Sequence, residues 1–364
     1  MTLILVLIGL VICLVYTALM AWIGYWLKRS KNTNGSNNHS KTISIVVPCR
    51  NEAHNLASLA QVIKHANVPI VLVDDHSTDN TFELAQTRFP SATVIQSEGE
   101  GKKAALLTGI RHTKTNHLLL LDADIRPTAT WIEKALAAIH SSSSELLLFP
   151  ILVSKTRGIL QAFEAFDMLG LMTVTRSTAN AGKAMLGNGA ALSISKEDYL
   201  VCANELKSEL ASGDDVFLVH AMKKRGKTIK FANDNALQVH ISPTKNLKSF
   251  VGQRIRWGQK SAAYRDGISM FFSWTVLVVS LWFLVAVFSL GYLAIEGRPS
   301  TPLFMLIALK ILVDMWLAIK ARKAFAYDIP SAALFLFSFY YPFYIFFVGI
   351  GGFFFRPNWK GRKV

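Results

Sequence analysis

Cysteine is scarce in this sequence, with 3 among 364 residues. Cys13, Cys49 and Cys202 have neither close pairing nor the spacing of metal ligands, so nothing indicates a disulfide framework or a zinc site. They fit a reducing cytoplasm. Acidic residues are also outnumbered, 24 against 39 Lys and Arg, which gives a net charge of +15. Basic chains can bind nucleic acid, but many of these cations flank apolar segments, so anionic lipid is the expected partner and nucleic acid is not.

Charged side chains are absent from residues 1–27, a run long enough to cross a bilayer core of about 30 Å as a helix. Lys28, Arg29 and Lys31 follow this run rather than precede it, unlike the basic start of a cleaved signal peptide. Basic flanks stay on the cytoplasmic side of a membrane. We therefore expect 1–27 to be an anchor in the inner (cytoplasmic) membrane and 28–41 to be a linker, with the next domain in the cytoplasm.

Residues 271–355 contain three more apolar segments separated by short connectors. If all three cross the membrane, the basic tail 356–364 ends outside, against the positive-inside tendency. Pro342 could break the last segment into a re-entrant hairpin, or the middle segment could lie shallowly. That middle segment carries Lys310 and Asp314, which are four residues apart and can pair on one helix face. The alternative for these two charges is a contact with substrate.

Residues 42–245 alternate strand and helix signals in the order typical of a parallel α/β sheet. Continuous apolar runs predict strands that are buried on both faces. Ligands of open α/β sheets bind beyond the carboxyl ends of the strands. The expected strands are 42–49, 69–75, 92–97 and 117–124.

Carboxylates gather at these expected strand ends, and clustered carboxylates need a cation, a proton-transfer role or donors from a ligand. Asp74 or Asp75 alone could simply cap the following helix. Asp122 and Asp124 together favour a hard divalent cation bound with a diphosphate. The polar residues at the strand ends are Arg50, Asn51 and Glu52, then Asp74 and Asp75, then Asp122 and Asp124.

Seven segments in register resemble the successive signatures of family 2 glycosyltransferases, which are inverting nucleotide-sugar enzymes with a GT-A fold. They are "SIVVPCRNEAHNL", "VLVDDHSTDNT", "EGKKAALLTG", "LLLLDADIRP", "GNGAALSISKEDYL", "SGDDVFL" and "QRIRW". The resemblance covers residues 44–257. It implies an α/β fold of the GT-A type, a Rossmann-like nucleotide-diphospho-sugar transferase domain over 42–245, with transmembrane helices at both ends of the chain.

The resemblance also implies a nucleoside pocket, in which carboxylates accept hydrogen bonds from a uracil imide or from ribose hydroxyls. A UDP-sugar is therefore the expected donor. The residues carried over to this pocket are Pro48, Arg50, Glu52, Asp74 and Asp75.

For the diphosphate, the resemblance implies three residues. Lys102, at a helix start, would bind phosphate or the polar edge of the sugar. Asp122 would face the ribose and sugar, and Asp124 would bind Mg²⁺ or Mn²⁺ directly, with Asp122 beside it. The alternative for Lys102 is a solvated surface lysine, which is the interpretation preferred for Lys103.

A general base must take the proton of the acceptor, and the family's second acidic residue of "GDD" falls on Asp215. Asp214 stands where the family more often has Glu, and it could instead cap the helix that starts there. "GNGAAL", with Gly187 and Asn188, would contact the transferred sugar and the acceptor. From the residues alone, a tight turn before a strand is equally consistent with "GNGAAL".

The last signature places Gln253, Arg256 and Trp257 in an interfacial helix expected over 246–270. Arg256 would neutralise the diphosphate, and Trp257 would stack on a sugar or lipid. Alternatively, both residues only anchor the helix to headgroups.

With at most four spans, the sequence favours transfer of one sugar to a hydroxyl of a lipid acceptor, similar to bacterial ceramide, carotenoid or hopanoid glycosyltransferases. A processive polysaccharide synthase is the alternative within the same class. A nucleotidyltransferase or an inactive membrane scaffold would be alternatives from other classes.

Overall fold

The computed structural model describes residues 2–29, 40–63, 66–154, 157–205, 214–261, 263–354, 358–359 and 362–363. Most of the expected linker 28–41 and part of the expected tail 356–364 lie outside these ranges. The chain forms two compact units. The first comprises Met1–Arg29, Thr156–Ser177 and Thr244–Pro357 and is called the membrane unit after its apolar helices. The second comprises Ser30–Lys155, Thr178–Pro243 and Asn358–Val364 and is called the catalytic unit because it contains most of the site residues expected from the sequence.

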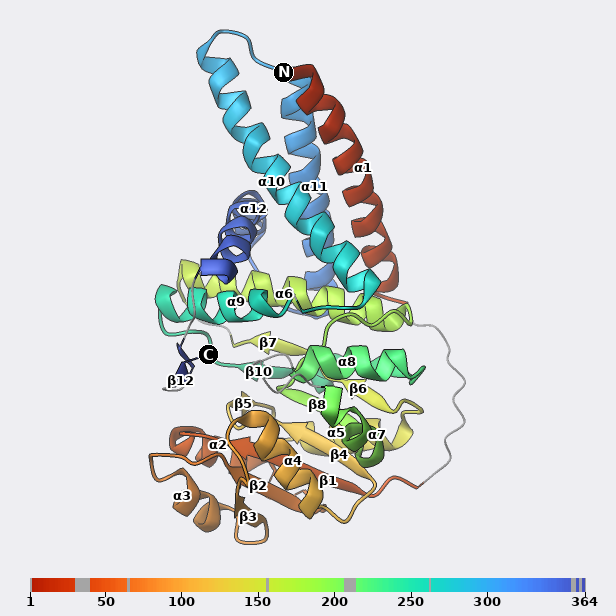
Figure 1. Cartoon of the computed structure of the whole chain (residues 1–364), viewed down its shortest axis with the longest axis vertical. Helices are drawn as coiled ribbons and strands as arrows, with labels where there is room; N and C mark the ends of the chain where they lie inside the picture. Colours follow the sequence, from red (N-terminus) through yellow and green to blue (C-terminus); the bar gives the residue numbers. More distant parts are fainter. Residues whose placement is uncertain are drawn as a thin grey trace. The chain divides into compact units, whose positions relative to one another are not determined.

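The catalytic unit contains a seven-stranded sheet with the order β3-β2-β1-β4-β8-β6-β9 (Figure 1). Strands β1 to β4 are parallel to one another, whereas β8 runs antiparallel to both β4 and β6. The strands are β1 Ile43–Cys49, β2 Ile70–Asp74, β3 Thr93–Gln96, β4 His117–Leu121, β6 Leu146–Leu148, β8 Ala191–Ser195 and β9 Ile229–Phe231.

The four strands expected from the sequence are thus present. Every residue of β2 and β4 is buried, which explains their continuous apolar sequences. A smaller sheet has the order β5-β10-β7, from Ile125–Arg126, Val239–Ile241 and Ile151–Val153. The helices of this unit include α2 Ala53–Ile63, α3 Thr81–Arg88, α4 Lys102–His112, α5 Trp131–Ser141, α7 Lys196–Cys202 and α8 Asp214–Lys224. Asn358–Trp359 and Arg362–Lys363 pair as β11 and β12.

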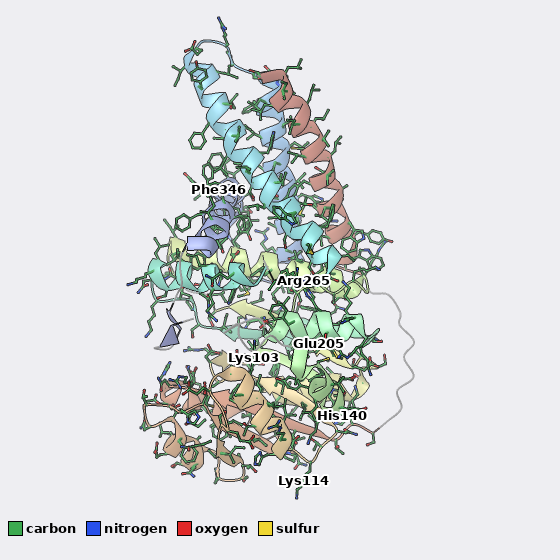
Figure 2. The ribbon with its side chains drawn as sticks, viewed as in Figure 1. Lys103, Lys114, His140, Glu205, Arg265 and Phe346 are labelled. Atoms are coloured by element: carbon green, nitrogen blue, oxygen red, sulfur yellow. The ribbon has the colours of Figure 1, made fainter. Side chains whose placement is uncertain are left out.

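Among its described residues, the membrane unit has four helices that are long and apolar enough to span a membrane. They are α1 Thr2–Trp26, α10 Gly267–Ile295, α11 Thr301–Ala324 and α12 Ser331–Phe354. Figure 2 shows side chains projecting outward along α1 and α10, where many large apolar residues are exposed, as expected of a lipid-facing surface.

Two further helices, α6 Ile159–Asn180 and α9 Leu247–Ser261, lie across one end of α1, α10 and α11 (Figure 1). Most of α6 therefore groups with the apolar helices, although its residues fall within the range 42–245 expected for the glycosyltransferase domain. A single continuous stretch of sequence does not show this grouping, because it depends on packing between distant segments.

Helix α12 contacts α6 near its start and α9 near its end. The Phe337 ring lies 5.3 Å from the Phe163 ring of α6, centroid to centroid. Further along α12, Gly352 accepts the side-chain N–H of Gln259 of α9 through its carbonyl oxygen at 3.2 Å. Pro342 lies inside α12 between these contacts.

The predicted pairing of Lys310 with Asp314 is confirmed, with 2.6 Å between Nζ and Oδ2. Tyr16 of α1 donates its hydroxyl hydrogen to the other oxygen of Asp314 at 2.6 Å. Lys310 also donates to the carbonyl oxygen of Ser338 in α12 at 3.3 Å. The pair therefore joins three apolar helices.

Candidate active site

The ends of β1 and β2 meet through Arg50 and Asp75. The Asp75 N–H donates to the carbonyl oxygen of Cys49 at 2.7 Å, and Arg50 Nη1 donates to the carbonyl oxygens of Asp75 and His76 at 2.5 and 3.1 Å. The Asp75 carboxylate accepts the N–H of Gly101, directly before α4, at 2.8 Å. Asp75 thus contacts the start of α4 and not that of α3, the helix following its own strand that the capping alternative describes, and it is only 2% exposed.

Asp74 offers an acceptor atom at the same sheet edge. Its Oδ2 accepts the N–H of Ser77 at 3.1 Å, whereas its buried Oδ1 has no hydrogen-bond partner among the described residues. A buried acceptor without a partner is costly, so a donor from a ligand would be favoured here. Glu52 is also buried and accepts from the Asn55 side chain at 2.6 Å, while Pro48 is partly exposed.

Lys102 points toward the acidic end of β4. Gly101 begins α4 with a φ of 94°, a backbone conformation that suits glycine. Lys102 Nζ then lies 2.5 Å from Asp122 Oδ1 and 3.2 Å from the carbonyl oxygen of Gly189. The solvated-surface interpretation of Lys102 is therefore wrong, because its side chain is only 23% exposed and ion-paired. Its neighbour Lys103 is labelled in Figure 2.

Asp122 and Asp124 follow β4 directly. The Asp122 N–H donates to the carbonyl oxygen of Ala190 at 2.9 Å, and Leu121 pairs with Ala191 in the antiparallel ladder. Asp124 is exposed immediately before β5. The described residues contain no group of three His, Cys, Asp or Glu side chains that could hold a metal. Two carboxylates fit a metal that also takes oxygen ligands from a diphosphate.

Asp215 lies in the first turn of α8, where two backbone N–H groups hold its carboxylate. Gly189 donates to Oδ2 at 3.1 Å, and Val216 donates to Oδ1 at 2.8 Å. Asp214 is the first residue of α8, and its side chain lies outside the described residues, as does the preceding segment 206–213.

The "GNGAAL" segment forms a loop that leads into β8. Asn188 accepts the N–H of Ala190 through its side-chain oxygen at 2.9 Å, which closes the loop as the turn alternative describes. Through Gly189, the same loop contacts Lys102 and Asp215. The structure therefore brings together four predicted site residues around one loop: Lys102, Asp122, Asn188 and Asp215.

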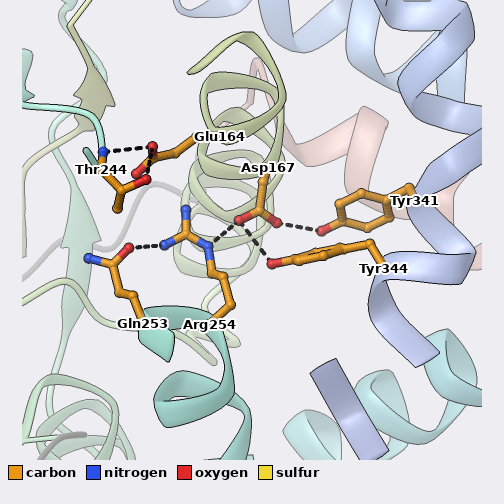
Figure 3. A network of polar contacts seen from close by, with 7 residues as sticks. All are labelled: Glu164, Asp167, Thr244, Gln253, Arg254, Tyr341 and Tyr344. Carbon is orange, nitrogen blue, oxygen red and sulfur yellow. Dashed lines mark hydrogen bonds and ion pairs between the residues drawn. The ribbon is translucent and has the colours of Figure 1, made fainter. Parts of the chain in front are cut away.

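The "QRIRW" signature lies on α9 in the membrane unit, where Arg254 is the buried arginine (Figure 3). Its Nε lies 2.6 Å from Asp167 Oδ2 of α6, and its Nη1 donates to Gln253. The Trp257 ring centroid is 4.2 Å from the Arg254 guanidinium carbon. Arg256 is partly buried. Gln253 and Trp257 thus contact Arg254, and their predicted contacts with substrate stay predictions.

Tyr341 and Tyr344 of α12 complete this buried cluster, because both donate hydroxyl hydrogens to Asp167, at 2.9 and 3.4 Å (Figure 3). Glu164, one turn earlier on α6, accepts from the backbone and side chain of Thr244 at 2.9 and 2.8 Å. Sequence reasoning missed these residues. The acidic residues of α6, in an otherwise apolar stretch, were the available signal.

The parallel strands with acidic carboxyl ends, and the Asp-x-Asp beside the partly buried Lys102, are the features expected of a glycosyltransferase of the GT-A type. The chain belongs to the family described as "Glycosyl transferase family group 2", whose model matches residues 117–350. The model described as "Glycosyl transferase family 2" matches residues 44–183. The resemblance seen in the sequence motifs is therefore confirmed.

Three similar proteins are glycosyltransferases by name. Glycosyltransferase AglE of Haloferax volcanii is 25% identical over 255 residues, which are 67% of this chain and 80% of that protein. Dolichol-phosphate mannosyltransferase of Pyrococcus furiosus is 31% identical over 108 residues, 28% of this chain and 31% of that protein. The 4,4'-diaponeurosporenoate glycosyltransferase of Staphylococcus aureus is 33% identical over 96 residues, 24% and 25% of the two chains. The chain thus spans less than a third of the last two relatives.

Among solved structures, the mannosyltransferase PcManGT from Pyrobaculum calidifontis, in complex with GDP-Man and Mn²⁺, has a TM-score of 0.54 and 16% sequence identity. The alignment covers 97% of both chains. This similarity confirms the GT-A fold.

Proposed function

We propose that this glycosyltransferase moves one sugar from a nucleotide-sugar donor, such as a UDP-sugar, to a lipid acceptor, with inversion at the anomeric carbon. The observation that carries the proposal is the link from Asp122 through Lys102 and Gly189 to Asp215. It brings the residues expected at the diphosphate and the expected base within one connected site. The names of the relatives support a lipid acceptor, and so do the four apolar helices.

In this mechanism, Asp215 accepts the proton of the acceptor hydroxyl as the new bond forms, a role that contributes about 10²- to 10⁴-fold. Lys102 places a positive charge beside Asp122, where a diphosphate needs neutralising charge. Asp74 and Asp75, with Arg50 between the strand ends, form the nucleoside side of the site.

Asp124 and Asp122 would hold Mg²⁺ or Mn²⁺, because two carboxylates and diphosphate oxygens supply the ligands that such ions prefer. When bound, the ion supplies charge neutralisation on the leaving diphosphate. The Mn²⁺ complex of PcManGT supports a divalent ion in this fold.

A hydroxyl acceptor is favoured over a lipid phosphate because of Asp215. A phosphate oxygen is already largely ionised at neutral pH and needs no base, whereas a hydroxyl does. The similarity to a dolichol-phosphate mannosyltransferase supports the phosphate as a second candidate. A processive synthase would add several sugars, so the length of the product distinguishes it from transfer of one sugar to either a lipid hydroxyl or a lipid phosphate.

We infer the orientation from the basic flanks of the apolar helices. Helix α12 touches α6 or α9 from Phe337 to Gly352, and it also packs on α10 and α11 through Phe339 and Ser338. We propose that α12 lies along the transverse helices α6 and α9, and that α1, α10 and α11 cross the membrane with the basic stretch after α1 and the basic end of α11 on the cytoplasmic side. This proposal puts the C-terminus on that side too.

The test combines product analysis with two substitutions. Membranes containing the enzyme are incubated with labelled UDP- and GDP-sugars, and the lipid extract is analysed for one added sugar. Asp215→Asn keeps the size of the side chain and removes the base, so turnover should collapse while donor affinity stays nearly unchanged. Asp214→Asn should be much milder. No labelled lipid with any donor, or a long polymer, would overturn the proposal.

A phosphate acceptor would give a different result. Its product is an acid-labile sugar phosphate, and Asp215→Asn would leave most of the turnover intact.

A further inference from the structure

The loop Gly187–Ala190 touches both acidic parts of the site. Gly189 donates its N–H to Asp215 Oδ2 at 3.1 Å, and its carbonyl oxygen accepts from Lys102 at 3.2 Å. Lys102 in turn pairs with Asp122 at 2.5 Å. One residue without a side chain thus connects the diphosphate side to the base through its two backbone groups.

We propose that this loop positions the general base: Gly189 N–H fixes the orientation of the Asp215 carboxylate and couples it to the Lys102–Asp122 pair. The inference rests on the proposed function, because it requires Asp215 to be the base. It assigns to the loop a task other than the contact with sugar and acceptor expected from the sequence.

Gly187 explains how the loop comes close enough to α8. A Cβ atom at this position would lie 2.4 Å from the backbone oxygen of Asp215 and 2.7 Å from its backbone carbon. Both distances are well inside van der Waals contact, and backbone atoms cannot rotate away as a side chain can. Any larger residue at 187 would therefore push the first turn of α8, and the carboxylate with it, away from the loop.

The loop is held firmly on its other side. Ala190 accepts from the Asp122 N–H, and Ala191 pairs with Leu121 in the antiparallel ladder. A carboxylate that is held by a fixed N–H donor keeps one lone pair directed at the acceptor, which is what a general base requires. Hydrogen bonds to an ionised carboxylate are also stronger than neutral ones, so the donor favours the ionised base.

The test compares Gly189→Pro with Gly189→Ala. Both substitutions add a Cβ, but only proline removes the N–H. Gly189 is not among the glycines with a positive φ, so neither substitution forces an L-residue into the left-handed region. For Gly189→Pro we expect kcat to fall by about 10- to 100-fold relative to Gly189→Ala, with the donor dissociation constant unchanged within about twofold.

A pH profile separates positioning from a loss of folding. Without the N–H, the ionised base is less favoured, so the acid limb of the kcat profile should move up by about one pH unit in Gly189→Pro. In Gly189→Ala that limb should stay in place. Thermal unfolding monitors folding, and Gly170→Ala, at an exposed position of α6 with open space around it, serves as the glycine control with unchanged kcat.

Gly187→Ala is an independent second variant, and it decides the question if Gly189→Pro does not fold. It should show the same loss of kcat and the same displaced acid limb. Equal kcat and equal acid limbs in Gly189→Pro and Gly189→Ala would overturn the inference. If Asp215→Asn itself keeps full turnover, then the base assignment in the proposed function fails instead.

Discussion

Arg254 of α9 and Asp167 of α6 form an ion pair at 2.6 Å, with side chains that are only 2% and 3% exposed. Removing one partner would leave the other charge buried without compensation, which typically costs about 3–5 kcal/mol. Arg254→Ala should therefore lower the thermal unfolding temperature of the purified protein strongly. Arg256→Ala is the matched control on the same helix, and it should reduce turnover with a much smaller loss of stability. Equal unfolding temperatures for the two variants would contradict this prediction.

The pair also shows what the sequence could not indicate. Asp167 and Arg254 are 87 residues apart, and no spacing rule connects positions on separate helices. The motif predicted importance for Gln253, Arg256 and Trp257, whereas the residue between them, Arg254, makes the buried contact. A short sequence motif contains only residues that are close together in the chain. It therefore cannot indicate which residue of a distant helix will pack against it.

The fold could be predicted from the sequence more completely than the contacts of the site. The four parallel strands were predictable because burial on both faces requires continuous apolar runs. The antiparallel pairing of β8 with β4 was not predictable, because the sequence of a strand and of its adjoining loop does not specify which other strand it will pair with. The path of α12 was left open for a similar reason: its composition suits a membrane span, and its contacts with α6 and α9 are tertiary.

Divalent metal should be required for transfer. Asp124→Ala removes an exposed carboxylate at the strand end and should reduce turnover by at least about 10²-fold, because charge on the leaving diphosphate is then less well neutralised. Chelator should abolish the activity of the unaltered enzyme, and added Mn²⁺ or Mg²⁺ should restore it. Asp234→Ala, which removes a carboxylate that begins the short turn Asn235–Leu237, should have no effect on turnover. Full activity in excess chelator would refute the requirement.

Both the catalytic unit and the C-terminus should face the cytoplasm. A fluorescent protein fused after Val364 should be fluorescent, and alkaline phosphatase at the same site should be inactive, because in the proposed topology α12 does not cross the membrane. The connector between α10 and α11, near Arg298, should give the opposite results with the two reporters. An active phosphatase at the C-terminus would show that α12 crosses, and periplasmic labelling of an engineered cysteine within residues 42–245 would show that the whole orientation is inverted.

His117, at the start of β4, should make stability depend on pH. Burial, reinforced by the nearby Lys41 cation, lowers the pKa of His117 to about 4, against about 6.5 in an unfolded chain. Between these values the unfolded chain binds more protons, so stability is present above about pH 6.5 and is lost as the pH falls toward 4. The contribution is about 3 kcal/mol over this window.

His117→Leu should remove that part of the pH dependence, as measured by thermal unfolding between pH 4 and pH 7. His54→Leu, at an exposed histidine of α2, is the control and should keep the slope of the unaltered protein. Parallel curves for His117→Leu and the unaltered protein would show that His117 does not carry the effect.

The Lys310–Asp314 pair has a consequence for how the protein is made. Either charge alone near the centre of a span opposes insertion from the translocon by about 2.5–3.5 kcal/mol. The two residues are one turn apart on α11 and can neutralise each other within that helix, so the nascent segment can enter lipid before α12, which follows it in the chain, is available. Tyr16 and Ser338 can then engage the pair once α1 and α12 are in place. Insertion of α11 thus does not require α12, whereas a variant that kept only one of the two charges should insert less efficiently.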